Sequence, residues 1–171
     1  MSDAVEWSIH CCTLLAALPE DQALPASRLA EYHDVPPAYL AKALQAMAAA
    51  GIVESRPGPT GGYRLARPPQ DITLLEVVQA VDGSGTAFRC SELRQRGPGA
   101  IDEPGAYRVK CGIARAMWRA EDAWRAELAA TSVGDMVVDF ITLASPARLQ
   151  RGLEWVQEVH VQRRSRRGLM T

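Results

Sequence analysis

The 171-residue chain lacks the long apolar run that a membrane-spanning helix needs. A span takes about 18 or more apolar residues in a row, and the richest late window, 133–144, is interrupted by Asp135 and Asp139. The first residues carry acids where a secretion signal would have a basic region. We therefore expect a cytoplasmic protein that makes no contact with a membrane.

Cysteines are few, and catalytic motifs are absent. In a reducing cytoplasm the four cysteines are expected to be thiols, metal ligands or redox sensors rather than a disulfide framework. The chain has no P-loop, dinucleotide fingerprint, nucleophile motif or His-Glu-x-x-His motif, so we predict that it is not an enzyme. A net charge of −1 neither supports nor excludes nucleic acid, because a basic face can be balanced by acids elsewhere.

What the chain does contain is the element order of a winged helix-turn-helix. Helical periodicity over 3–18 precedes two shorter helical segments, 26–33 and 37–50, which a tight turn separates. Two strand-like segments, 52–55 and 63–65, then flank a turn rich in glycine and proline. This order predicts a mainly α fold with a small β-hairpin wing.

Such a fold makes double-stranded DNA a candidate partner. The third helix of a winged helix-turn-helix enters the major groove, and the wing contacts phosphates or the minor groove. The residues predicted to contact DNA from this helix and the wing are Ala38, Tyr39, Lys42, Gln45, Arg56, Thr60 and Arg64. The alternative is that they are ordinary solvated side chains.

The pattern of the remaining residues predicts a loop and several helices. A helix is expected over 74–81, followed by a loop rich in glycine and proline and then by a long helix over 112–131. A further helical stretch over 146–162 leads into a basic tail, RRSRR at 163–167, which is either a solvated end or a phosphate contact. The expected division is a DNA-binding domain (1–83), a loop (84–111), a long-helix region (112–145), and a C-terminal helix with the basic tail (146–171).

Four segments carry a family pattern: AKALQ at 41–45, AGIVESR at 50–56, GGYRLA at 61–66 and ITLLEVVQAVDG at 72–83. Together they resemble the recognition helix, the wing and the following helix of the Rrf2 family, a bacterial family of winged-helix regulators that includes iron–sulfur and nitric-oxide sensors. The resemblance covers roughly residues 3–140. It implies a homodimer with a long dimerisation helix crossing the two subunits. Such a dimer reads a pseudo-palindromic promoter site, because operator symmetry mirrors protein symmetry.

The resemblance also implies that the loop 84–111 holds an iron–sulfur cluster. In family members that hold one, this loop supplies three closely spaced cysteines, and the first helix of the partner subunit supplies a further ligand. This chain has only two cysteines there, Cys90 and Cys111, which we call the loop cysteines, with twenty residues between them. A cluster in this chain therefore needs other ligands.

Glu6 and His10 can supply those ligands. Residues four apart lie on one face of a helix, so this carboxylate and imidazole, the acid–imidazole pair, can bind one metal ion together. Two thiolates and two harder ligands divide naturally over a [2Fe–2S] cluster, with the loop cysteines on one iron and the acid–imidazole pair on the other. Rieske centres show that one iron accepts such a replacement. The alternatives are zinc held by the same residues, or no metal.

Three neighbours of the acid–imidazole pair have different expected roles. Trp7 is expected to couple the state of the cluster to the DNA-binding domain, and the alternative for it is a core aromatic. Cys11 and Cys12, the helix cysteines, cannot both face the site with His10, and are expected to pack as small apolar residues.

The combined prediction is a homodimeric repressor or activator whose promoter affinity is controlled by a redox-active [2Fe–2S] cluster. The signal would be redox stress, nitrosative stress or iron–sulfur status. Two other functions stay open. One is a cluster-free regulator of the same fold that senses thiol oxidation or a small ligand. The other is a zinc-containing enzyme or a protein–protein adaptor that has lost DNA binding.

Overall fold

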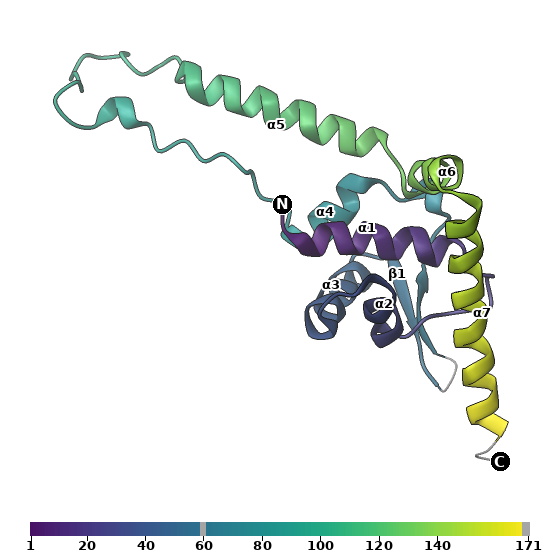
Figure 1. Ribbon diagram of the computed structural model, residues 1–171. Coiled ribbons are helices and arrows are strands. Elements are labelled where there is room, and N and C mark those ends of the chain that lie inside the picture. The colour runs from purple at the N-terminus through teal and green to yellow at the C-terminus, as the bar shows by residue number, and fades with distance from the viewer. Residues whose placement is uncertain (59–60, 169–171) are drawn as a thin grey trace.

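The protein is known from a computed structural model that describes the backbone over residues 1–58 and 61–168 and side chains up to Val159. It is mainly helical with one two-stranded antiparallel sheet, as the sequence predicts. A body of packed helices carries the sheet at one end, and a long helix with an extended loop projects from the other end (Figure 1). Within the described residues no helix is long and apolar enough to cross a membrane.

The winged helix-turn-helix forms the core of the body. It consists of α1 (Asp3–Ala16), α2 (Ala26–His33), α3 (Pro37–Ala49), β1 (Val53–Arg56) and β2 (Gly62–Leu65). The turn between α2 and α3 is sharp because Asp34 adopts a left-handed conformation with φ 52° and Pro37 begins the next helix. The fully buried side chains of these elements and of the segments that connect them include Leu24, Leu29, Leu40, Leu44, Met47 and Ile52. Their burial holds α2 and α3 in one orientation.

The wing depends on two adjacent glycines. Gly62 has a φ of +144°, and a Cβ at this position would collide with the backbone of Leu24 and Pro25. The collision arises because Leu24 pairs with Tyr63 across two backbone hydrogen bonds of 2.7 and 3.0 Å. A Cβ on Gly61 would meet the carbonyl of Arg56. The Gly-Gly-Tyr sequence of the wing therefore allows the hairpin to lie directly against the segment before α2.

After the wing, α4 (Leu74–Asp82) packs against α1 and α3. Its N-terminus has a capping box, in which Thr73 and Glu76 each bond the backbone of the other. At its C-terminus, the carboxylate of Asp82 accepts hydrogen bonds from the backbone N–H and hydroxyl of Ser2. The first turn of α1 is thereby tied to α4, and no side chain caps α1.

The projecting arm consists of the loop and α5 (Gly112–Ala130). The start of the loop is fastened to α5. The Glu121 carboxylate accepts from the backbone N–H of Ala87 at 3.2 Å, and Arg125 donates to the carbonyl of Gly85 at 2.8 Å. A short 3-10 helix, η2 (Leu93–Gln95), lies inside the loop. Further along the arm, α5 carries exposed apolar side chains, including Ile113, Met117 and Trp124.

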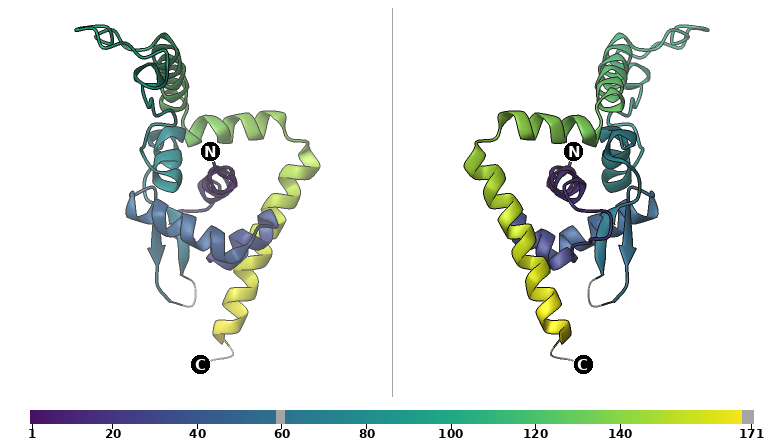
Figure 2. Two further views of the ribbon diagram at one scale, coloured as in Figure 1. Left: turned by 90° about the vertical axis from the view of Figure 1, so that its left-hand side faces the viewer. Right: turned by 90° about the vertical axis from the view of Figure 1, so that its right-hand side faces the viewer.

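Two helices follow α5. The long helix expected over 112–131 ends at Ala130, and a helix that the sequence pattern did not predict, α6 (Val133–Leu143), begins directly after it, with Ser132 and Asp135 forming a second capping box. The last helix, α7 (Pro146–Gly168), packs onto α2 through Trp155 and Tyr32, whose ring centroids are 4.7 Å apart. Figure 2 shows α1 end-on, surrounded by α4, α6, α7 and the α2–α3 pair.

Candidate metal centre and nucleic-acid interface

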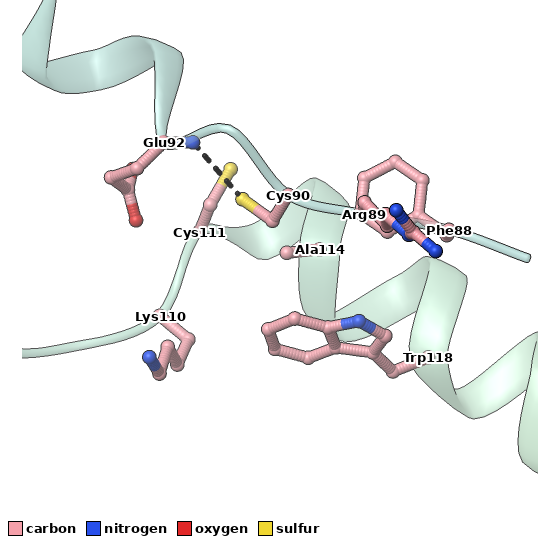
Figure 3. A pocket seen from close by; sticks show the side chains of 8 residues that line it. All are labelled: Phe88, Arg89, Cys90, Glu92, Lys110, Cys111, Ala114 and Trp118. Atoms are coloured by element: carbon pink, nitrogen blue, oxygen red, sulfur yellow. Dashed lines mark hydrogen bonds between the residues drawn. The ribbon is translucent and has the colours of Figure 1, made fainter. Parts of the chain in front are cut away.

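The loop cysteines lie close together at the base of η2 and the start of α5. Their side chains point into the same space (Figure 3), beside a cavity of about 280 Å³ that Phe88, Arg89, Glu92, Lys110, Ala114 and Trp118 also line. Cys90 is exposed and Cys111 is half-buried. The backbone N–H of Glu92 donates to Sγ of Cys90 at 3.4 Å, and Cys111 is the N-cap of α5. The sulfur of Cys90 therefore has a backbone N–H beside it, and Cys111 stands at the N-terminal end of α5.

The acid–imidazole pair lies on α1, away from the loop. Both side chains are exposed, and their spacing places them on one face of the helix. In the part of the chain that the structure describes, no three His, Cys, Asp or Glu side chains come together closely enough to hold a metal ion. The loop between α4 and α5 projects away from α1 (Figure 1), and Cys111 lies at the start of α5. One chain therefore presents the predicted ligands as two separate pairs.

A second histidine, which the sequence did not single out as functional, lies beside His10 of the acid–imidazole pair. The ring of His33, at the end of α2, lies 5.7 Å from the ring of His10. Burial, followed by the charge of His10, lowers the pKa of His33 to about 4. Among the described residues its Nε2 is buried without a hydrogen-bond partner. No sequence pattern points to this contact, because the two residues are far apart in the chain and meet only by packing of α1 on α2.

The helix cysteines are part of the core. Cys11 and Cys12 are both 0% exposed, and burial raises the pKa of each thiol to about 12. Cys12 lies 3.9 Å from the sulfur of Met47 in α3. These thiols stay protonated at physiological pH, so they pack as apolar residues, as expected.

Trp7 lies on α1 at the side of that helix that faces α3 and α4. It is half-buried against the core and borders a cavity of about 490 Å³. Tyr39 and Lys42 of α3 and Val81 of α4 line the same cavity. The indole thus occupies the boundary at which α1 meets the helix that is expected to contact DNA, with open space beside it.

The expected DNA-contacting residues of α3 form an exposed surface. Ala38, Tyr39, Lys42 and Gln45 are all exposed, and 69% of Tyr39 is accessible. Within the described structure Lys42 has no carboxylate within ion-pair distance. The ammonium group is therefore available for a phosphate.

The two arginines of the wing, unlike Lys42, form ion pairs within the described part of the protein. The Arg64 guanidinium donates to the carboxylate of Glu54, its cross-strand partner, and to the backbone carbonyl of Glu20 at 3.0 Å. Arg56 lies 3.4 Å from the same carboxylate. The hydrogen bond from Arg64 lowers the pKa of Glu54, so the pair stays charged. Thr60 lies outside the described residues.

Comparisons with known proteins show the family and the fold. Residues 1–139 match the model of the family described as "Rrf2: Iron-dependent Transcriptional regulator". Among curated proteins, the helix-turn-helix-type transcriptional regulator YwgB of Bacillus subtilis is 32% identical over 124 residues, which cover 72% of this chain and 75% of that protein. The regulator YffB of Lactococcus lactis is 32% identical over 117 residues, covering 68% and 73%.

Solved structures show the same fold at low sequence identity. CymR, the global cysteine regulator of B. subtilis, has a TM-score of 0.62 at 22% identity, covering 81% of this chain and 95% of that one. IscR of T. potens has a TM-score of 0.62 at 19% identity, covering 87% and 95%. The oxidized form of Staphylococcus aureus CymR has a TM-score of 0.58 at 19% identity, covering 80% and 94%.

Proposed function

The chain belongs to the Rrf2 family of DNA-binding transcriptional regulators, and we propose that a redox-active [2Fe–2S] cluster controls its affinity for promoter DNA. The observation that carries the proposal is the pair of loop cysteines beside one cavity, in the loop expected to hold a cluster. A promoter-binding protein acts where the DNA is, so the proposal places it in the cytoplasm.

The ligand chemistry suits a two-iron cluster. Two thiolates satisfy one iron, and a carboxylate with an imidazole satisfies the other, as Rieske centres accept non-thiolate ligands on one iron. All four side chains are exposed or half-buried, and Glu6 and His10 have no competing side-chain hydrogen bond among the described residues. When bound, the cluster would supply a one-electron acceptor. The loop cysteines, the acid–imidazole pair and their surroundings set how strongly it is held.

The separation of the two ligand pairs favours a shared site in a homodimer. Since one chain holds the pairs on elements that point apart, each site would combine the loop cysteines of one subunit with the acid–imidazole pair of the other. Exposed apolar side chains on α5 and α6, including Met117, Trp124, Val138 and Ile141, are suited to cover one another in such a dimer. Residues 112–145 would then be the dimerisation region, next to a DNA-binding domain (1–83) and a cluster loop (84–111).

The route from cluster to DNA would run through α1. This helix bears the acid–imidazole pair and packs on α3, and Trp7 lies at the boundary between them. A change in the iron–ligand bonds would displace α1, and the space beside Trp7 would let the indole move with it. The two α3 helices of the dimer would then shift relative to each other and to the two halves of a pseudo-palindromic site.

The ligand assignment is tested by substitution. Anaerobically purified protein should be coloured and contain about two irons per subunit. Cys90→Ala or Cys111→Ala should abolish the cluster, because thiolates carry most of the bonding. Glu6→Ala should have a milder effect, since water can replace one carboxylate. A fully loaded, spectroscopically unchanged Cys111→Ala protein would rule out this ligand set.

The redox switch needs a separate measurement. Replacing two thiolates by a carboxylate and a neutral imidazole reduces the negative charge on the cluster and eases its reduction, as in Rieske centres. Gel-shift titrations with oxidised and reduced protein, both with intact clusters, should give different affinities. Equal affinities would leave cluster loss or nitrosylation as the signal.

A second candidate function is a cluster-free regulator that senses thiol oxidation. The orientation of the loop cysteines favours it, since side chains that point into one space are what a disulfide requires. Colourless, metal-free protein would support this function if a thiol oxidant changed its DNA affinity and a reductant restored it. Colourless protein with bound zinc would instead indicate a zinc site.

A further inference from the structure

The loop that carries the two cysteines has two arms, and one side chain joins them. The first arm, 88–95, contains Cys90, and the return arm, 107–111, contains Cys111. Arg94, on the first arm, donates from Nη2 to the backbone carbonyl of Val109 on the return arm at 2.9 Å. Its guanidinium also lies 5.5 Å from the ring centroid of Tyr107. Among the described residues, the bond from Arg94 to Val109 is the one hydrogen bond that connects the two arms.

Arg94 also acts on the segment that holds Cys90. Its guanidinium binds both carboxylate oxygens of Glu92, at 2.5 and 2.9 Å. Glu92 has a φ of +50°, a left-handed conformation that a non-glycine residue adopts only when its surroundings hold it there. In this conformation the backbone N–H of Glu92 donates to Sγ of Cys90. Arg94 thus stabilises the turn that positions the first sulfur.

The second sulfur is positioned through Nη2 of the same guanidinium, which donates both to Glu92 and to the carbonyl of Val109. Cys111 follows Val109 by two residues, so the bond to the Val109 carbonyl sets where the return arm enters α5. The hydrogen bond to Glu92 outweighs the opposing effect of desolvation and raises the pKa of Arg94, whose electrostatic interactions extend to both loop cysteines. The side chain is therefore permanently charged, and its charge lies near both sulfurs.

We propose that Arg94 is a positioning residue that holds Cys90 and Cys111 together as a pair. The inference rests on the proposed function only in taking this pair as the reactive or metal-binding group. A long exposed loop loses much conformational entropy when its ends are ordered, and few apolar contacts here offset that loss. The bidentate fork of an arginine, which lysine lacks, is suited to bind a carboxylate and a carbonyl together.

The test uses the full-length protein with Arg94→Gln, Arg94→Lys and, as a matched control, Arg96→Gln two residues away on the same loop. The first measurement needs no cluster. Reduced, metal-free protein is treated with diamide, and formation of the Cys90–Cys111 disulfide is followed by mass spectrometry. The two thiols lose two protons and two electrons, and diamide takes them up to become the corresponding hydrazine.

Arg94→Gln should slow the formation of this disulfide about tenfold or more, because the sulfurs are no longer held in reacting geometry. Arg94→Lys should recover part of the rate by keeping the charge near the sulfurs, and Arg96→Gln should match the wild type. An Arg94→Gln rate equal to that of the wild type would overturn the inference. So would an equal slowing by Arg96→Gln, because the effect would then be one of general charge.

A second measurement uses anaerobically loaded protein and follows the bleaching of its colour in the presence of an iron chelator. Loss of a residue that supports metal ligands typically costs about 10–100-fold in affinity. Arg94→Gln should therefore bleach about 10–100-fold faster than the wild type and Arg96→Gln, and equal bleaching rates would overturn the inference. If the wild type holds no cluster, the proposed function fails, and the disulfide rate alone decides the role of Arg94.

Discussion

Lys42 and Arg64 are both candidate DNA contacts, but their side chains have different partners within the protein. Lys42 is exposed on α3 and, within the residues described, has no carboxylate in ion-pair range. Arg64 is bound to Glu54 and to the carbonyl of Glu20. We therefore expect Lys42→Ala to remove a phosphate contact. Arg64→Ala should instead loosen the wing, so its effect on DNA binding would be indirect.

The two effects differ in their salt dependence. Each phosphate contact contributes about 0.9 to the slope of log affinity against log salt. A dimer has two copies of Lys42, so Lys42→Ala should reduce the slope by about 1.8. Between about 50 and 200 mM salt, a fourfold change, the affinity gap between Lys42→Ala and the wild type should therefore shrink about 12-fold. The loss of DNA affinity caused by Arg64→Ala should stay constant over the same range of salt concentration.

Fluorescence anisotropy with a labelled promoter duplex, titrated at five salt concentrations, measures these slopes. Thermal unfolding of the same variants supplies the control: Arg64→Ala should lower the unfolding midpoint, and Lys42→Ala should leave it unchanged. The reasoning is refuted if Lys42→Ala keeps the wild-type slope. It is refuted for the wing if Arg64→Ala lowers the slope as much as Lys42→Ala does while leaving the midpoint unchanged.

Three further predictions concern the core, the wing and pH. Iodoacetamide at pH 8 should alkylate the loop cysteines of native metal-free protein and spare the helix cysteines, whose pKa is raised to about 12 by burial; mass spectrometry showing equal labelling would contradict that burial. Gly62→Ala should lower the free energy of unfolding by about 2 kcal/mol or more in a denaturant titration, whereas Gly85→Ala, whose Cβ meets nothing within 4 Å, should be nearly neutral. The free energy of unfolding of metal-free protein should fall as the pH drops from about 6.5 towards 4, because the folded state holds His33 at a pKa of about 4 and the unfolded chain binds the proton first. The full shift corresponds to about 3 kcal/mol, and partial exposure of the ring reduces the expected loss to about 1–2 kcal/mol. His33→Gln should remove this part of the pH dependence, and an unchanged pH profile in that variant would disprove the assignment.

Local signals predicted the helix-turn-helix closely. The helix expected over 26–33 has those bounds, and the helix expected to begin at Pro37 begins there. Proline at a first helical position and glycines in the wing act over a few residues, so they can be read from sequence. The same kind of local signal did not predict α6, which begins directly after the long helix ends at Ala130. There the Ser132–Asp135 capping box begins α6, and Val133 is fully buried.

The sequence by itself determined the fold class, the family and the residue types available for a metal site, because these depend on periodicity, turn chemistry and motif spacing. Only the tertiary structure decided which of those residues meet. It placed His33 against His10, tied Arg64 to Glu54, and joined the two arms of the cysteine loop through Arg94. It also kept the loop cysteines apart from the acid–imidazole pair within one chain. Contacts of this kind depend on how helices and loops pack in three dimensions, and no local pattern in the sequence encodes that packing.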